Sequence, residues 1–169
     1  TYTFDYTVIE GNTDRPAGTI PISLMLKDQQ GQYNDPASTT VETNTASIDA
    51  HSPAISAVTF LPSSGVLQVG DTATATVQSD GVGFTAGTIT INGVDVAGTL
   101  IDNLDNTYDV VYTVTEGDTD RLDTADLPVN ITLYDVAGNS SGAYTTADPN
   151  NRPGVDANSP EVKSIAFNI

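Results

Sequence analysis

The chain has no cysteine, no tryptophan and only five basic residues among its 169 residues. Without cysteine, disulfide bonds cannot stabilise the fold, although secretion is not excluded. Phosphate groups are bound by clustered Lys and Arg side chains, so this composition argues against nucleic acid as a partner and against anionic membrane surfaces. No apolar run approaches membrane-spanning length, and the sequence does not open on a charged-then-apolar signal pattern. We therefore expect no membrane insertion.

Helical periodicity is also missing, and apolar residues alternate with a period of two instead. Tyr108, Val110, Tyr112 and Val114 alternate in this way, which predicts a half-buried strand with both tyrosines pointing into the core. Asn92-Gly93 is a strong signal for a two-residue hairpin turn. Seven strands are expected, near Ile55–Leu61, Thr72–Ser79, Thr85–Asn92, Val94–Ile101, Thr107–Glu116, Leu127–Asp135 and Gly142–Ala147. Seven short strands without a helix predict an all-β, immunoglobulin-like sandwich.

What the sequence does have is a long internal repeat. TYTFDYTVIEGNTDR (1–15) returns as TYDVVYTVTEGDTDR (107–121), with ten of 15 positions identical. IDAHSP (48–53) likewise returns as VDANSP (155–160). A period of this length fits a whole small domain and predicts a tandem array. The expected domains are the C-terminal half of one repeat with its linker at 1–52, a complete domain at 53–158, and the first strand of a following repeat at 159–169.

The half repeat at the start of the sequence raises a problem of burial. Its strands are expected to place Tyr2, Phe4, Tyr6 and Val8 on one apolar face, and a three-stranded half domain leaves such a face and its edges uncovered. Pairing with another copy of the chain is one solution, and an origin as an internal piece of a longer array is another. We keep pairing in trans as a hypothesis.

Four motifs carry a resemblance to a known family. They are LQVGDTATATV (67–77), TYDVVYTVTEGDTD (107–120), LPVNITLYDVAGN (127–139) and DANSP (156–160). In their order and spacing they resemble bacterial immunoglobulin-like repeats of the Big type. The resemblance implies a stalk in a surface or secreted adhesin, and hence an extracellular or bacterial cell-surface location. The linker DANSP is also similar to the linkers of cadherins, in which calcium between domains stiffens the array.

Acidic residues give the chain a net charge of −17, and 18 of the 22 are Asp. Asp favours turns and oxygen-rich cation sites, and Ca²⁺ takes six to eight hard oxygen ligands. Reversal of direction at each expected strand places these residues in loops at the two ends of a domain, where stacked neighbours would repel one another unless a cation binds. The candidate Ca²⁺ ligands are Glu10, Asp14, Asp49, Asp71, Asp102, Asp105, Glu116, Asp118, Asp120, Asp156 and Asn158.

A simpler interpretation of these acids stays open: they terminate turns and keep the protein soluble. Asp28 and Asp135, each before a glycine turn, suit turn capping at least as well as ligation. His51 replaces the Asn158 position in the first linker and removes one oxygen ligand there. Arg121 recurs directly after Thr-Asp and is expected to form a surface ion pair.

Enzyme chemistry has little support. His51 is the only histidine, cysteine is absent, and a small sandwich offers no cleft for sugar rings. We therefore expect a non-enzymatic spacer repeat whose partners are the neighbouring repeats of the same polypeptide. Two alternatives stay open: a module that binds a glycan or a host protein, and an accessory domain of a secreted polysaccharide-active enzyme.

Overall fold

The computed structural model describes residues 2–41 and 43–168. The chain divides into two compact units, Thr1–His51 and Ser52–Ile169. Among the described residues the regular structure is all β apart from one 3-10 turn, η1 at Ala97–Thr99. The all-β class predicted from the alternating sequence pattern is confirmed at this level. No helix in the described part of the chain has the length and apolar character to cross a membrane.

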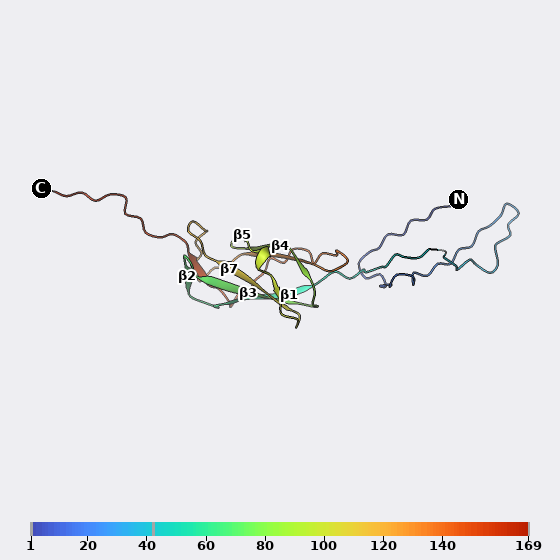
Figure 1. The fold of residues 1–169 in the computed structure, drawn as a ribbon, viewed down its shortest axis with the longest axis horizontal. Helices are drawn as coiled ribbons and strands as arrows, with labels where there is room; N and C mark the ends of the chain where they lie inside the picture. Colours follow the sequence, from blue (N-terminus) through green and yellow to red (C-terminus); the bar gives the residue numbers. More distant parts are fainter. Residues whose placement is uncertain (1, 42, 169) are drawn as a thin grey trace. The chain divides into compact units, whose positions relative to one another are not determined.

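The unit Ser52–Ile169 contains every assigned strand (Figure 1). Their bounds are β1 (Ile55–Leu61), β2 (Val66–Gln68), β3 (Thr72–Ser79), β4 (Thr85–Ile91), β5 (Val94–Asp95), β6 (Ile101–Asp102), β7 (Thr107–Thr113), β8 (Val129–Tyr134) and β9 (Gly154–Asp156). Three sheets result: a four-stranded sheet in the order β1-β3-β7-β6, a three-stranded sheet β5-β4-β8, and the pair β2-β9. Only β2 and β9 run parallel.

The alternating side chains of these strands form one core. Tyr108, Val110 and Tyr112 of β7 are fully buried, as the sequence pattern predicted, and so are Ile89 of β4 and Ile131 of β8. Residues from both larger sheets belong to a single buried cluster, so the unit is sandwich-like. Full burial of each such aliphatic side chain contributes about 1.5–3 kcal/mol, and the core is therefore what holds this unit together.

Two of the expected strands are wrong. The segment expected as Val94–Ile101 is broken into β5, η1 and β6, because Asp95 Oδ1 accepts the Ala97 N–H (3.0 Å) and turns the chain. The segment expected as Gly142–Ala147 forms a single isolated bridge, Ile131 with Tyr144. The last strand is instead the short β9, which pairs with β2. The Asn92-Gly93 hairpin is confirmed, with φ of 54° and 83° at the two turn residues.

The unit Thr1–His51 has no assigned strand in its described residues. It is held by isolated bridges, Arg15 with Ile48, Leu24 with Ser38, and Lys27 with Tyr33. The strands expected near residues 2–8 and 20–26 are therefore not formed. Tyr2, Phe4, Tyr6 and Val8 are exposed, because this unit contains nothing equivalent to β1–β4 to cover them.

Candidate functional site

Within each repeat, the recurring loop contacts the recurring linker of the same repeat. In the second repeat, the loop 114–121 after β7 binds the linker 155–159, and we call this the second junction. Gly117 N–H donates to the Ala157 carbonyl (2.9 Å), and Ala157 N–H donates to Asp120 Oδ1 (2.8 Å). Arg121 and Val155 exchange backbone hydrogen bonds of 2.8 Å in both directions. The loop thus holds the linker by backbone and carboxylate together.

The linker side chains close the second junction further. Asn158 Nδ2 donates to Asp120 Oδ2 (2.8 Å), and the Ser159 N–H donates to Glu116 Oε1 (3.0 Å). The Asn158 N–H reaches Asp156 Oδ1 at 3.4 Å. Four of the acids and amides predicted as Ca²⁺ ligands, Glu116, Asp120, Asp156 and Asn158, therefore lie at this junction, but its three carboxylates do not form a group within ligand reach of one another among the described residues. In the structure they act as hydrogen-bonding groups, and metal binding stays a prediction.

Asp118 has a different place, inside the loop. Its carboxylate accepts hydrogen bonds from Tyr112 Oη (2.8 Å) and from the Thr115 N–H and Oγ1 (2.9 Å each). Partial burial opposes ionisation, but these hydrogen bonds outweigh it and lower the pKa of Asp118 below its ordinary value. Asp118 therefore shapes the loop and ties it to the core through Tyr112.

The first repeat builds the same junction from loop 8–15 and linker 48–51, which we call the first junction. Gly11 N–H donates to the Ala50 carbonyl, Ala50 N–H donates to Asp14 Oδ1, and Arg15 exchanges backbone bonds with Ile48, all at 2.8 Å. Each bond is the counterpart of one in the second junction. Ala50 is the one buried residue among the described residues of its unit. The junction is thus the most enclosed part of the unit Thr1–His51.

The interior of the first loop repeats as well. Asn12 stands where the second loop has Asp118, and Asn12 Oδ1 accepts from Tyr6 Oη (2.8 Å) and from the Ile9 N–H (2.9 Å). Tyr6 is the counterpart of Tyr112. An amide and a carboxylate therefore perform the same capping task, which requires an oxygen acceptor but no charge.

His51 makes the clearest difference between the junctions. Its Nδ1 lies 2.9 Å from Asp14 Oδ2, where the second junction has the Asn158 amide on Asp120. Hydrogen bonds from the Ala50 N–H and then from His51 lower the pKa of Asp14, and the hydrogen bond with Asp14 raises the pKa of His51. No partner was predicted for His51, and the structure shows that it pairs with Asp14.

The first junction also gathers groups of the kind that hold metal ions. One ligand atom from each of Asp14, Asp49 and His51 lies within 4.8 Å of the others, and all three residues are exposed. Asp14 and Asp49 were predicted as ligands, whereas His51 was expected to weaken the site. Their counterparts in the second junction are Asp120, Asp156 and Asn158, which offer oxygen atoms alone. Glu10, the last candidate of the first repeat, is exposed in the same loop.

Asp71 lies beside the second junction, as predicted. Its Oδ2 accepts the Gln68 N–H (2.8 Å), and its carbonyl accepts the Val114 N–H (2.9 Å) at the start of the junction loop. A small pocket lined by Gln68, Val69 and Asp156 continues from this turn to the linker. The turn 68–71 is therefore the third segment of this end of the unit.

Asp102 and Asp105 lie at the other end of β7. Asp102 accepts the Gly83 N–H (2.7 Å) and the Leu104 N–H (2.8 Å). Asp105 accepts the Thr107 hydroxyl (2.6 Å) and N–H (3.1 Å), and these bonds lower its pKa. Both residues thus cap their own turns, as the simpler interpretation predicts, and Asp102 also binds the loop between β3 and β4 through Gly83. Their expected meeting with the acids of the first junction stays a prediction.

Turn capping is confirmed for the two aspartates that precede glycine turns. Asp28 Oδ1 accepts the N–H groups of Gln30 and Gln32, at 2.9 and 2.8 Å. Asp135 Oδ1 accepts the Asn139 N–H at 2.8 Å. The same local role recurs at equivalent positions of the two repeats.

Sequence reasoning missed the second role of Asn92. This side chain is buried, and its Nδ2 donates to the Thr119 carbonyl (2.7 Å) and to Tyr112 Oη (3.2 Å). Its Oδ1 accepts from Arg121 Nε (3.0 Å), so the surface ion pair expected for Arg121 is replaced by a hydrogen bond to an amide. In the sequence, the hairpin signal Asn92-Gly93 already accounted for Asn92, so no further role was predicted for it.

Comparison with protein-family models, with curated proteins and with solved structures finds no match for this chain. The junctions therefore have to be interpreted from their own chemistry. They contain hydrogen-bonded carboxylates and amides in exposed loops, which suits cation binding and linker fixation.

Proposed function

We propose that the chain is a spacer repeat from the stalk of a bacterial extracellular adhesin. In this proposal the unit Ser52–Ile169 is an immunoglobulin-like domain of a tandem array, and Thr1–His51 is part of the repeat before it. The order β1-β3-β7-β6 opposite β5-β4-β8 supports an immunoglobulin-like arrangement. The observation that carries the proposal is the junction, because both repeats fasten their exit linkers with matching hydrogen bonds.

A fastened linker is what a spacer needs. A free linker of several residues behaves as a flexible chain, and the domains that it connects then reorient independently. Here the buried Ala50 and Ala157 are hydrogen-bonded to the loop of their own repeat. The first residues of each linker therefore lose their conformational freedom. Such a device recurs in an array only if the direction of each successive domain matters. The proposal assigns no catalytic step to the chain.

Calcium would complete the joint. With a net charge of −17, acids clustered at a junction repel one another unless a cation neutralises them. Asp120, Asp156, Asn158 and Glu116 offer carboxylate and amide oxygens, the ligands that Ca²⁺ prefers. The first junction replaces one oxygen by the His51 imidazole, and we expect it to bind Ca²⁺ more weakly. The ion would hold the linker to the loop more firmly and limit bending.

Thermal unfolding of the whole chain tests this proposal, first with EDTA and then with excess Ca²⁺ or Mg²⁺. Binding to the folded state alone raises stability by about 2.7 kcal/mol when the free ion exceeds its Kd a hundredfold. We expect an increase in Tm with Ca²⁺ that Mg²⁺ does not reproduce. The same increase should be lost in Asp156→Asn. The matched control is Asp123→Asn, which removes the same charge from an exposed position just after the loop 114–121 and outside the assigned ligands.

An unchanged Tm with Ca²⁺ would contradict calcium binding while leaving the fastened linker in place. If Asp123→Asn abolished the increase as completely as Asp156→Asn, the effect would reflect general charge screening and the assigned ligands would be wrong. Limited proteolysis of residues 48–52 and 155–160 provides a separate measurement of linker fixation. Rapid cleavage within these segments would contradict the spacer proposal itself.

A further inference from the structure

The residues after β9 have the sequence of β1 but not its surroundings. Residues 159–168 (SPEVKSIAFN) correspond to residues 52–61 (SPAISAVTFL) in the register of the repeat. Phe60 of β1 is 3% exposed, whereas its counterpart Phe167 is 90% exposed. The same holds for Val58, which is buried, and its exposed counterpart Ile165. The segment 160–168 follows β9 as a coil without a strand partner (Figure 1).

In the unit Ser52–Ile169, β1 pairs with β3, and one side chain, Asn151, adds a second contact to its backbone. Asn151 Oδ1 accepts the Phe60 N–H, and Asn151 Nδ2 donates to the Phe60 carbonyl, both at 2.8 Å. The Asp148 N–H donates to the Val58 carbonyl (3.0 Å) beside it. A side-chain amide thus pairs with the backbone of β1 as a neighbouring strand would. The Phe60 ring is buried in the core at the same point.

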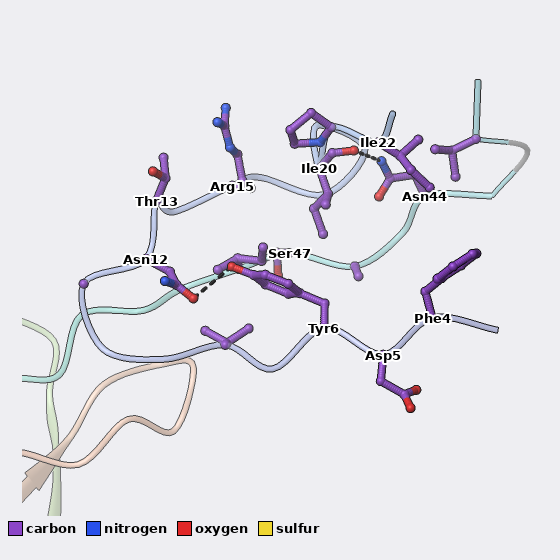
Figure 2. Close-up of a pocket in the computed structure, with 16 residues that line it drawn as sticks. Phe4, Asp5, Tyr6, Asn12, Thr13, Arg15, Ile20, Ile22, Asn44 and Ser47 are labelled. Atoms are coloured by element: carbon purple, nitrogen blue, oxygen red, sulfur yellow. Dashed lines mark hydrogen bonds between the residues drawn. The ribbon is translucent and has the colours of Figure 1, made fainter. Parts of the chain in front are cut away.

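The counterpart of Asn151 in the first repeat is Asn44, and it lies in an uncovered apolar groove. The groove belongs to the unit Thr1–His51, and Phe4, Tyr6, Ile20 and Ile22 are among its lining residues (Figure 2). Asn44 Nδ2 donates to the Ile20 carbonyl at 3.2 Å. This groove therefore carries the amide that would clamp a β1-like strand, together with apolar side chains that such a strand would cover.

We infer that the segment 160–168 of one copy docks in this groove of a second copy, in the place that β1 takes in its own unit. Phe167 enters the apolar groove, and the Asn44 amide turns to the Phe167 N–H and carbonyl. The segment is also electrically suited to an acidic partner, since Glu161 and Lys163 leave it without net charge. The segment 53–106 is not available for this role because its strands already form their own core.

The contact is head-to-tail. Each copy has one groove and one β1-like segment, so a docked pair still offers one free groove and one free segment, and the association continues as an open chain or closes into a ring. The segment takes the place of β1 alone, and the positions of β3 and β4 stay empty, so we expect weak association. This inference depends on the repeat register and on the groove. It does not depend on calcium, and its test is performed in EDTA.

Sedimentation equilibrium of the whole chain, from micromolar to millimolar concentration, tests the inference. We expect the average mass to rise with concentration for the parent chain and to remain that of a monomer for Phe167→Asp. Val136→Asp is the matched control, because Val136 is equally exposed and lies outside both surfaces. It should associate like the parent. Asn44→Ala should weaken association about tenfold through the loss of two hydrogen bonds.

A mixing experiment separates head-to-tail docking from symmetric pairing. Ile22→Asp blocks the groove but leaves the segment intact, and Phe167→Asp blocks the segment but leaves the groove intact. Each variant alone should be monomeric, and their mixture should form dimers and nothing larger. A parent chain that is monomeric at all concentrations, or self-association of Phe167→Asp, would overturn the inference. The melting of each variant's sandwich unit, followed by the near-ultraviolet signal of Tyr108 and Tyr112, verifies that it is folded.

Discussion

The two repeats are similar in sequence and form matching junctions, but the equivalent side chains of their strand segments are buried in one repeat and exposed in the other. Tyr108 is fully buried and its counterpart Tyr2 is 74% exposed, although both lie in segments with ten of 15 residues in common. The loop and linker, by contrast, form matching hydrogen bonds in both repeats. The junction needs only two short segments, a loop and a linker 36 or 37 residues apart, and their contacts form in both repeats. The strand face instead requires a covering sheet.

The largest expected difference follows from burial. Tyr108→Ala should destabilise the sandwich unit by about 3–5 kcal/mol, the range measured for large aromatic truncations in cores. Tyr2→Ala, the same substitution at the equivalent exposed position, should change stability by less than about 0.5 kcal/mol. Urea unfolding at a concentration where the chain is monomeric measures both. Equal effects would mean that the face of the first repeat is covered in solution.

The next effect concerns a glycine. A Cβ on Gly154 would lie 2.9 Å from the Arg121 carbonyl oxygen and 2.9 Å from the Asp123 nitrogen, both backbone atoms that cannot move aside. Gly154→Ala should therefore cost about 1–3 kcal/mol through overpacking. The first repeat has Ser47 at the same position, so Ser47→Ala should be nearly neutral. A neutral Gly154→Ala in the same unfolding assay would show that the second junction is looser than described.

A smaller effect is expected from the carboxylate that pins each linker. Asp120→Ala removes the acceptor of the Ala157 N–H, and loss of one hydrogen bond should accelerate exchange of that amide about fivefold to tenfold. Asp14→Ala should do the same for the Ala50 amide. Hydrogen exchange by NMR measures each amide separately. Asp120→Asn, which keeps an oxygen acceptor, is the control, and an equal acceleration in this variant would attribute the effect to charge instead.

The smallest effect is a pH dependence confined to the first junction. The raised pKa of His51 makes its contact with Asp14 complete below pH 6.5, and the contact is lost as pH rises through that raised value. On the acidic side, the contact is complete above pH 3.8, the ordinary pKa of the Asp14 carboxyl. It is lost as the pH falls through the lowered pKa of Asp14. Asn158 gives the second junction no such loss on the alkaline side. NMR titration of His51 should find its pKa above 6.5 in the parent chain and closer to 6.5 in Asp14→Asn. Identical pKa values in the two would exclude the pair.

Sequence patterns predicted the strands whose burial is decided by simple alternation. The expected bounds of β1 and β3 match the structure: β3 alternates throughout, and β1 alternates from Val58 onwards, after a register shift between Ile55 and Ala57. β9 was missed because it has three residues and pairs with distant segments: in parallel with β2, nearly 90 residues earlier, at Val66–Gly154, and by a single bridge from Val155 to Arg121. A pairing that distant leaves no local pattern.

The sequence predicted which residues lie at the junctions better than it predicted what those residues bind. Recurrence of Asp14 with Asp120 correctly indicated a shared task, and the structure brings both to their linkers. Carboxylates accept N–H hydrogen bonds and also bind cations, so residue type alone could not separate a linker clamp from a metal site. The partner of His51 could not be predicted either, because it depends on how loop and linker cross.

The parallel pairing of β2 with β9 has a consequence for how this unit bears tension. β2 lies near the start of the unit and β9 near its end, and both run in the same direction. A pull that separates the two ends draws the strands past one another, so the bonds from Gly154 N–H to Gly65 (2.8 Å) and from Arg152 N–H to Ser63 (3.0 Å) are loaded in shear. Bonds loaded in shear must break together, whereas a peeled hairpin opens one bond at a time. The short strand that the sequence concealed is therefore the one that resists extension first.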